Sequence, residues 1–337
     1  MGRGAGGVSA RTRPLPAVRL AMWLIGVDGG ASHTACWVAD ESGRVRGRGE
    51  AGPCNLGSVG AEAAEANLGA AVRAATVQAG TRPQDVAAAC FGVAGFDRPA
   101  DRAALMEIVR RLGFTGPFRL ENDAVVAWAG ATRARPGVVV VAGTGSIAYG
   151  RVGDGRSARA GGWGPLFGDE GSGFDLGKRA VAAALAAADG RGPATALSPL
   201  IVRSLGLAEV EDAVAALRWH QADPAKVATL APLVQRAAEN GDGVALDIIA
   251  GAAQALAEMA GAVLARLGLR PAGAVVAAGG GLLLEPAPLR RALDAALRRR
   301  GVSGGLQMPL LSPTAGALLL AWAALGGNPD SWQPAGT

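Results

Sequence analysis

Short runs of apolar residues alternate with longer Ala-rich or amphipathic segments along most of this chain, which is the pattern of strands alternating with helices. The first three runs, 23–27, 35–39 and 44–49, are separated by short turns and predict a meander of three strands. The elements predicted next are a helix over 58–78 that begins at Ser58, a strand over 86–93, a helix over 98–112, a strand over 118–120 and a helix over 124–130.

The same order of elements starts again at Val138. A second meander is predicted from strands over 138–142, 147–152 and 157–160, and helices dominate 171–270, with the clearest helical spacing over 244–267. The chain is completed by a strand over 274–278, a helix over 288–299, a strand near 306 and a helix over 314–324. This repetition predicts an internal duplication, with two α/β halves and a ligand cleft between them.

A chain of 337 residues is long enough for two domains. We expect a first domain over 21–130 and a second over 131–327, with the last helix, 312–325, able to pack back onto the first. Residues 1–20 are rich in Arg and Gly and have no apolar period, which predicts a disordered tail. Residues 328–337 are expected to form a second tail.

The charge balance argues against binding of nucleic acid. Lys and Arg outnumber Asp and Glu by 33 to 28, but four of the Arg residues lie in the first 20 residues, which hold no acid. The rest of the chain is therefore nearly neutral, and no basic stripe is interleaved with aromatic residues. The longest apolar run, 315–325, is too short to cross a bilayer. We expect no nucleic-acid or membrane partner.

The cysteines indicate a cytoplasmic protein without a cysteine-bound metal. Cys36, Cys54 and Cys90 are scattered and odd in number, which fits a reducing compartment and no disulfide framework. No CxxC pair is present, so a Cys-based zinc or iron–sulfur site is not expected within one chain. A P-loop is also excluded, because Gly177-Lys178 is followed by Arg179 and not by Ser or Thr.

Three predicted strands end in turns rich in glycine. The first turn reads Asp28-Gly-Gly-Ala-Ser-His-Thr34, the second Ala142-Gly-Thr-Gly-Ser146 and the third Val276-Ala-Ala-Gly-Gly-Gly281. Glycine lets backbone amides approach an anion closely, and the hydroxyls add further donors. Each turn alone could be an ordinary hairpin or strand-to-helix turn. Their order, spacing and strand context together predict a nucleotide site.

These three motifs resemble those of the sugar kinase/heat-shock ATPase/actin superfamily. Within it, the chain from Leu24 to Leu325 resembles the BadF/BadG/BcrA/BcrD-type ATPase family, which contains N-acetylglucosamine kinase. The resemblance implies an α/β fold of two actin-like, ribonuclease H-like domains with the ligand cleft between them. It also implies ATP and Mg²⁺ as cofactors, and transfer of the γ-phosphoryl of ATP to the C6 hydroxyl of an amino sugar, with N-acetylglucosamine as the expected acceptor.

The resemblance assigns the three turns to the nucleotide. Contacts to ATP and its phosphates are expected from Gly29, Gly30, Ser32, Thr34, Gly143, Thr144, Gly145, Gly162, Gly279, Gly280 and Gly281. Asp28 cannot face a phosphate favourably unless a cation lies between them. It is therefore expected on the Mg²⁺ side, with the contact made through water.

Asp123 is the expected catalytic base. It follows a predicted strand in Glu121-Asn122-Asp123, at the start of a helix. In the resembled kinases a matching acid accepts the proton of the sugar hydroxyl as that hydroxyl attacks the γ-phosphoryl. Two alternatives stay open: Glu121 is the base, or Asp123 only caps its helix.

The sugar side is also implied by the resemblance, which places sugar contacts at Asn55, Asp123, Gly145, Ser146 and Asp169. Amide and carboxylate groups are the partners that sugar hydroxyls need. Trp163 lies in the Gly-rich run before Asp169, and it either walls the sugar pocket or packs in the core.

Several alternatives stay open at this level. The acceptor could instead be glucosamine, N-acetylmuramic acid or glucose. Selection among these sugars depends on how the pocket accommodates an N-acetyl group, which the sequence does not show. A function of another class is an ATPase that activates or regulates a partner protein. The segment 244–267 could bury the face of a homodimer, although a core helix has the same pattern.

Overall fold

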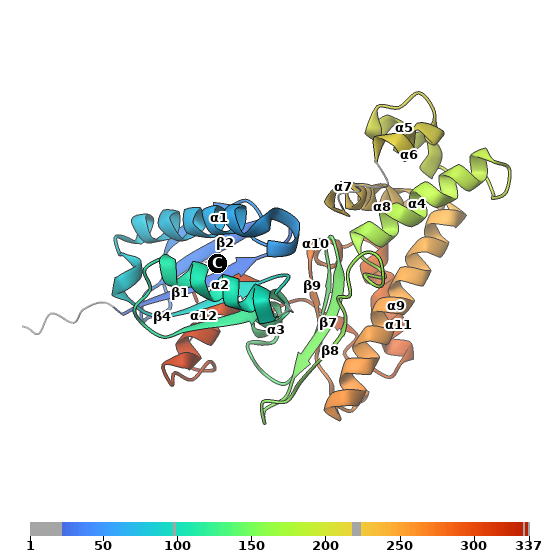
Figure 1. The fold of residues 1–337 in the computed structure, drawn as a ribbon. Helices are drawn as coiled ribbons and strands as arrows, with labels where there is room; N and C mark the ends of the chain where they lie inside the picture. Colours follow the sequence, from blue (N-terminus) through green and yellow to red (C-terminus); the bar gives the residue numbers. More distant parts are fainter. Residues whose placement is uncertain (1–21, 97–98, 218–223, 333, 336–337) are drawn as a thin grey trace, which may run out of the picture.

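The structure, a computed structural model, describes residues 22–96, 99–217, 224–332 and 334–335. The segment 1–20, expected to be a disordered tail, lies outside the described residues. Figure 1 shows two α/β halves side by side, with the C-terminal helix lying against the first half.

The first half is built on a five-stranded sheet in the order β3-β2-β1-β4-β5. Strands β1, β2 and β3 form an antiparallel meander, whereas β4 and β5 run parallel to β1. The carboxyl ends of β1, β4 and β5 therefore meet at one edge of the sheet. The strand bounds are β1 (Trp23–Gly29), β2 (Thr34–Ala39), β3 (Val45–Ala51), β4 (Val86–Val93) and β5 (Phe118–Asn122).

The second half repeats this plan. Its sheet has the order β10-β9-β6-β7-β8, with an antiparallel meander of β6, β7 and β8 and with β9 and β10 parallel to β6. The predicted fold class, a duplicated pair of α/β halves, is confirmed. The strand bounds are β6 (Gly137–Ala142), β7 (Ser146–Arg151), β8 (Ser157–Gly161), β9 (Val276–Gly279) and β10 (Leu306–Gln307).

Helices cover both sheets. In the first half, α1 (Leu56–Ala79) and α2 (Pro99–Arg111) share one core with the sheet, and α3 (Asp123–Thr132) shares another core with α12 (Pro313–Ala324). The second half carries α4 (Gly173–Ala188), α5 (Leu197–Leu205), α6 (Ala213–Ala216), α7 (Pro224–Ala228), α8 (Ala231–Glu239), α9 (Gly243–Leu267), α10 (Gly281–Leu284) and α11 (Pro288–Arg299). Single 3₁₀ turns occur at η1 (Pro83–Asp85), η2 (Val210–Asp212) and η4 (Pro271–Gly273).

Helix α12 packs against α3 and β1 of the first half. Glycines allow this close approach: a Cβ on Gly316 would lie 2.2 Å from the carbonyl oxygen of Val126, and a Cβ on Gly26 would lie 2.6 Å from the amide nitrogen of Leu318. The last helix therefore completes the core of the half in which the chain begins.

Helix α9 is the core helix of the second half. Among the described residues it is the one helix long and apolar enough to cross a membrane by length and composition alone. Its apolar residues are buried against β6, β7 and β8, with α8 and α11 beside it. Packing of this kind accounts for its hydrophobicity without a membrane. The homodimer face suggested for 244–267 stays a prediction.

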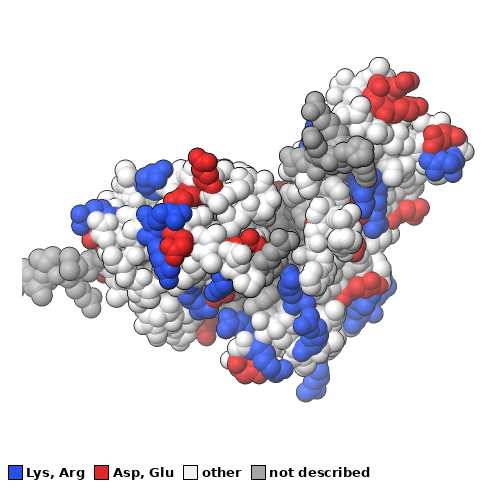
Figure 2. All heavy atoms as spheres, viewed as in Figure 1, with Lys and Arg blue, Asp and Glu red and all other residues white. Residues whose placement is uncertain are grey.

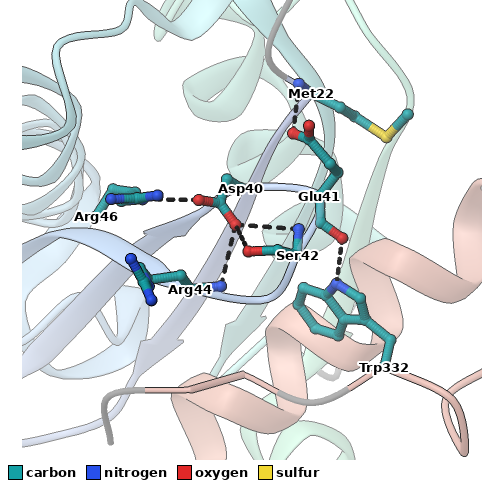
Figure 3. Close-up of polar contacts among 7 residues, drawn as sticks. All are labelled: Met22, Asp40, Glu41, Ser42, Arg44, Arg46 and Trp332. Atoms are coloured by element: carbon teal, nitrogen blue, oxygen red, sulfur yellow. Dashed lines mark hydrogen bonds and ion pairs between the residues drawn. The ribbon is translucent and has the colours of Figure 1, made fainter.

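The chain after α12 packs on the turn between β2 and β3 (Figure 3). The Asp40 carboxylate closes this turn by accepting hydrogen bonds from two of its amides. Trp332 is 5% exposed, and its indole N–H donates to the carbonyl of Glu41 at 3.0 Å. Ala335 forms a bridge to the start of β3. In its described part, the segment 328–337 is thus attached to the first half and is not a loose tail.

Candidate active site

A cavity of about 520 Å³ lies between the two halves. Figure 2 shows the surface hollowed there, and on this face Lys and Arg side chains are interspersed with Asp and Glu. The first half contributes the β1–β2 turn, the start of α1 and the segments after β4 and β5, and the second half contributes the β6–β7 turn, β8 and the loop before α4. The predicted site residues that line the cavity are Ser32, Asn55, Asp123, Gly143, Thr144, Gly145, Ser146, Gly162 and Asp169.

The β1–β2 and β6–β7 turns share one hydrogen-bond plan. The first amide of each turn, that of Gly30 or Gly143, donates back across the turn at 2.9 Å. In the described part of the chain, the next two amides of each turn have no protein partner, and they belong to Ala31, Ser32, Thr144 and Gly145. All four of these residues line the cavity, so the two turns are candidates for binding an anion. Of the residues expected to contact the nucleotide, Gly30 and Gly143 use their amides within their own turns, whereas the amides of Ser32, Thr144 and Gly145 stay free.

Two residues of the first turn have structural partners. The hydroxyl of Thr34 is buried and donates to the carbonyl of Gly52 at 2.8 Å, so it is not available to donate to a phosphate as expected. A Cβ on Gly29 would lie 2.2 Å from Sγ of Cys54, so the glycine is needed there for packing. Both contacts hold the loop that leads to Asn55.

The second turn is held from behind by the first turn of α4. The amide of Gly173 donates to the carbonyl of Gly143 at 2.8 Å, and the amide of Phe174 donates to the carbonyl of Thr144 at 3.2 Å. Ser172 caps this helix by accepting from the amide of Asp175. The carbonyls of Gly143 and Thr144 therefore accept hydrogen bonds from α4, whereas the amides of Thr144 and Gly145 stay free at the cavity.

Asp169 is held against the same turn. It is 7% exposed, and its Oδ1 accepts a hydrogen bond from the amide of Ser146 at 3.2 Å. A Cβ on Gly145 would lie 3.0 Å from both carboxylate oxygens, so only glycine lets the carboxylate come this close. The backbone of Asp169 has φ +61°, a left-handed conformation that is uncommon for residues other than glycine. Burial raises the pKa of this carboxyl above its usual range.

The third glycine turn does not line this cavity. It follows β9, which pairs with β6, and it lies against the end of β6. Gly280 has φ +76°, and a Cβ there would lie 2.4 Å from the carbonyl oxygen of Ala142. Gly281 has nothing within 4 Å of a Cβ, and a Cβ on Gly279 would lie 3.0 Å from the side chain of Val141, with its nearest backbone atom 3.6 Å away. Gly280 is thus needed by the fold, whereas Gly281 leaves open space beside the turn.

These two neighbours give a matched pair of substitutions. Gly280→Ala is expected to reduce the free energy of unfolding by about 2–4 kcal/mol, because it combines a positive φ with a backbone clash. Gly281→Ala is expected to leave the melting temperature unchanged and to raise KM for ATP several-fold if a nucleotide approaches this backbone. Thermal unfolding and initial rates at varied ATP would measure both. Equal melting temperatures for the two variants would contradict the packing argument, and an unchanged KM for Gly281→Ala would remove this turn from the nucleotide site.

Asp28 and Asp123 meet at one edge of the first sheet. Asp28 lies at the carboxyl end of β1, and Asp123 follows the carboxyl end of β5. Burial, and secondarily the charge of Asp123, raise the pKa of Asp28 to about 7. A carboxyl held in this way is ready to receive a cation, which would restore its ionised form.

Asp123 is the first residue of α3, and its neighbour Asn122 is the N-cap. The side chain of Asn122 accepts from the amide of Ala124 at 3.1 Å, and Oδ1 of Asp123 accepts from the same amide at 2.8 Å. Because Asn122 already supplies the cap, capping alone does not account for Asp123, which also lines the cavity. Glu121, the alternative base, is paired with Arg119 and does not line the cavity.

Asn55 has a structural role that the sequence did not indicate. It is the N-cap of α1, which begins at Leu56 and not at Ser58, and its Oδ1 accepts from the amide of Gly57 at 3.0 Å. A Cβ on Gly95 would lie 2.2 Å from this Oδ1, so Gly95 makes room for the amide group. With Oδ1 used by the helix, Nδ2 is the group that can donate to a sugar hydroxyl.

Trp163 is exposed and lines the cavity, so the alternative that it packs in the core is wrong. The guanidinium carbon of Arg159 lies 4.5 Å from the centre of its ring, within the range of a cation–π contact. Arg159 also lines the cavity and was not predicted. Its position between two alanines of a predicted strand was the available signal, because neighbours along a strand face opposite sides.

The residues present fit a single Mg²⁺ ion bound mainly through its own waters. Among the described residues, no group of three or more His, Cys, Asp or Glu side chains forms a cage for a metal. Mg²⁺ that accompanies a nucleotide needs only one or two carboxylates in addition to phosphates and waters. Burial and the charge of Asp123 both disfavour the ionised form of the Asp28 carboxyl. A cation nearby would offset both effects, so Asp28 meets that requirement.

Two α/β halves of one topology, with the free amides of two glycine turns and the carboxyl groups of Asp123 and Asp169 at a cavity between them, define the class of actin-like two-domain phosphotransferases and ATPases. Asp28, at the carboxyl end of β1, is not among the residues that line this cavity. Comparison with known families agrees with this class and identifies one family within it. The chain belongs to the BadF/BadG/BcrA/BcrD ATPase family, whose model matches residues 25–321.

Individual relatives cover most of the chain. An N-acetylmuramic acid/N-acetylglucosamine kinase of Clostridium acetobutylicum is 35% identical over 77% of this chain and 85% of its own length. An N-acetyl-D-glucosamine kinase of Dictyostelium discoideum is 33% identical over 73% of this chain and 80% of its own. A crystal structure provisionally assigned to an N-acetylglucosamine kinase of Chromobacterium violaceum superposes with a TM-score of 0.72 at 31% identity, covering 90% of this chain and 99% of that one.

Proposed function

We propose that this protein is an ATP-dependent amino-sugar kinase that phosphorylates the C6 hydroxyl of N-acetylglucosamine. The observation that carries the proposal is that Asp123, Asn55 and Asp169 line the same cavity as the free amides of two turns. Phosphoryl transfer to a sugar needs a carboxylate at the hydroxyl and anion-binding groups at the phosphates, both held at one place. The names of the three relatives support the same reaction.

Asp123 would act as the base. A carboxylate oxygen accepts the proton of the attacking hydroxyl while the hydroxyl oxygen bonds to the γ-phosphorus and the bond to the leaving ADP oxygen breaks. Its place in the first turn of α3 stabilises the carboxylate before it accepts the proton, because the helix N-terminus favours negative charge. The hydrogen bond from the amide of Ala124 fixes the position of this carboxylate at the cavity.

The amides of Thr144 and Gly145 would receive the phosphate oxygens, joined across the cavity by those of Ala31 and Ser32. They act as a preorganised electrostatic cradle, which needs no rearrangement as charge develops. Asp28 would hold Mg²⁺ through water, and the ion, when bound, would neutralise phosphate charge beside the transferred group.

The sugar would be oriented by Nδ2 of Asn55 and by the carboxylate of Asp169. Both are fixed by the backbone around them, Asn55 as a helix cap and Asp169 through the amide of Ser146. A ligand held by rigid groups presents one hydroxyl to the base and keeps water from taking its place. We also propose a cytoplasmic location, which suits three free and buried cysteines.

A coupled assay of ADP release tests the proposal with N-acetylglucosamine, glucosamine, N-acetylmuramic acid, glucose, 6-deoxy-N-acetylglucosamine and no sugar. We expect N-acetylglucosamine to be turned over, with ATP hydrolysis in the absence of sugar slower by about 100-fold or more, because acceptor and phosphate share one cavity. The 6-deoxy sugar should bind and give no product. ATP turnover that ignores every sugar would instead favour an ATPase that acts on a partner, and turnover of the 6-deoxy sugar would move the phosphorylated position.

A further inference from the structure

The connections between the two halves lie side by side. The chain passes from the first half to the second at residues 133–136, between α3 and β6, and it returns at residues 308–312, between β10 and α12. The amides of Leu310 and Leu311 donate to carbonyls in the last turn of α3, at 3.2 and 3.1 Å. Because hinges are short segments that absorb changes in φ and ψ, a rotation of one half against the other is expected to be taken up here.

The first connection has an unusual backbone. Arg133 and Ala134 both have a positive φ, +55° and +56°, which is uncommon for residues other than glycine. The amides of Arg133, Ala134 and Arg135 all donate back to carbonyls of α3. A connection that is folded back in this way keeps its conformation only if the surrounding structure holds it.

The C-terminal segment makes contacts that hold this connection. Its described residues within 328–335 form what we name the C-terminal strap. Nε and Nη2 of Arg135 lie 2.9 and 2.8 Å from a carboxylate oxygen of Asp330. Nη2 of Arg133 donates long hydrogen bonds, of 3.5 and 3.4 Å, to two backbone carbonyls of the strap. Both arginines of the connection therefore contact the strap.

The strap is itself anchored on the first half. The indole of Trp332 is buried, stacks on Trp322 of α12 with the ring centres 5.6 Å apart, and donates to the carbonyl of Glu41 (Figure 3). Ala335 exchanges two backbone hydrogen bonds with the β2–β3 turn and the start of β3. The strap thus ties the connection to the sheet of the first half.

We propose that the C-terminal strap holds the connection 133–136 in the conformation that keeps the two walls of the cavity at their binding distance, and that it thereby sets the affinity for both substrates. The walls belong to different halves, with Asn55 and Asp123 on the first and Asp169 on the second. A connection released from the strap samples more conformations, and only a fraction of them bring the walls together. Apparent affinity falls by that fraction for each ligand that needs both walls, whereas the loaded enzyme reacts as before.

Trp332→Ala tests this in the full-length protein, because it removes the buried anchor of the strap. KM for N-acetylglucosamine and KM for ATP are expected to rise by the same factor, about 3- to 10-fold, with kcat within about twofold of wild type. Hydrogen exchange at the amides of residues 133–135 should accelerate by about 10-fold or more. Trp332→Phe keeps a ring on Trp322 and should restore most of each value. The matched control is Ser331→Ala, whose hydroxyl donates to the carbonyl of Asn328 within the strap, and it should change nothing.

Arg135→Glu gives a second test that leaves the core intact, because the side chains of Arg135 and Asp330 are both exposed. Two like charges then face each other, and both KM values should rise by about 2- to 3-fold. The double variant Arg135→Glu with Asp330→Arg should return both values to those of the wild type. The proposal is overturned if KM rises for one substrate alone, if both KM values fall, or if no variant of the strap or the connection changes them.

The kinase assignment fails or stands separately. If the wild type turns over N-acetylglucosamine and its KM values are insensitive to all these variants, the kinase assignment stands and the strap proposal is wrong. If the wild type turns over no sugar, the kinase assignment fails, and calorimetric titration with Mg²⁺ and the non-hydrolysable ATP analogue AMP-PNP tests the strap instead. Binding to Trp332→Ala that is weaker than to wild type and to Ser331→Ala supports the strap, and equal binding to all three overturns it.

Discussion

Replacement of Asp123 by Asn is expected to lower kcat for sugar phosphorylation by about two to four orders of magnitude, the usual contribution of a general base. The amide has nearly the shape of the carboxylate, and Asn122 continues to cap α3, so the fold should be unaffected. KM for the sugar should change little, since an amide can still accept a hydrogen bond from the hydroxyl. Initial rates and thermal unfolding of the same preparation would measure both effects.

Two further substitutions make the result specific. Glu121→Gln removes the alternative base, which pairs with Arg119 outside the cavity, and it should retain most of the activity. Asp154→Asn removes an exposed carboxylate in the β7–β8 turn and should be silent in kinetics. If Asp123→Asn keeps its kcat while Glu121→Gln loses it, the base is Glu121, and if neither loses it, the transfer does not depend on a carboxylate from β5.

Asp28→Asn is expected to reduce activity and to increase stability. Without the carboxylate, Mg²⁺ loses its anchor at the phosphates, and kcat/KM should fall by about 100-fold or more. In the protein without nucleotide, however, the buried carboxyl with a pKa of about 7 opposes folding whenever it must ionise. The amide removes this unfavourable charge and should therefore raise the melting temperature at neutral and alkaline pH.

The size of this effect on stability depends on pH. Below pH 4 the carboxyl is protonated in both the folded and the unfolded chain, so the two proteins should melt alike. Between pH 4 and 7 the unfolded chain ionises Asp28 but the folded chain does not, so the wild-type protein loses stability relative to the variant. Above pH 7 the difference should stay constant, at no more than about 4 kcal/mol.

The control substitution for stability, Asp154→Asn, is expected to change the melting temperature in the opposite direction. The amide and guanidinium of Arg156 hold the pKa of Asp154 below its usual range, so Asp154→Asn should slightly lower the melting temperature at neutral pH. Mg²⁺ with ATP should narrow the difference between Asp28→Asn and the wild type, because the cation favours the ionised carboxylate. A variant that is less stable than wild type at pH 8 would contradict the argument from burial.

Most of the fold could be predicted from the sequence, because alternation and helical spacing are local properties. The predicted strand over 86–93 and the predicted helix over 288–299 have the same bounds as β4 and α11. The duplicated order of elements was also visible, since two meanders each start with a buried strand and a glycine turn. These features need no knowledge of how distant segments meet.

Hydrogen-bond partners could not be predicted in the same way. Ser58 and Asn55 are both good caps, and only the backbone conformation shows that Asn55 takes this position. Thr34 carries a hydroxyl in the first glycine turn, but in the folded chain that hydroxyl meets the carbonyl of Gly52, 18 residues further along. The residue type limits the hydrogen bonds that a side chain can form. Tertiary contacts decide which of these hydrogen bonds forms in the folded chain.

In the candidate site, too, some features could be predicted from the sequence and others depend on tertiary contacts. Asp123, Asn55 and Asp169 were expected together, and they do line one cavity, whereas their catalytic roles remain proposals. Arg159 was missed because an arginine in a short strand looks like an ordinary exposed residue. The raised pKa of Asp28 could not be foreseen either, since it depends on burial and on a carboxylate nearly a hundred residues away.

The return of α12 to the first half has a consequence for the order in which the protein is completed on the ribosome. The face of β1 at Gly26 and the side of α3 at Val126 are both covered by this last helix. The strands made first therefore lack part of their core until α12 has been synthesised, and Val139 and Ala277 of the second sheet belong to the same core. We therefore expect the first half to become native only after the second half has been translated.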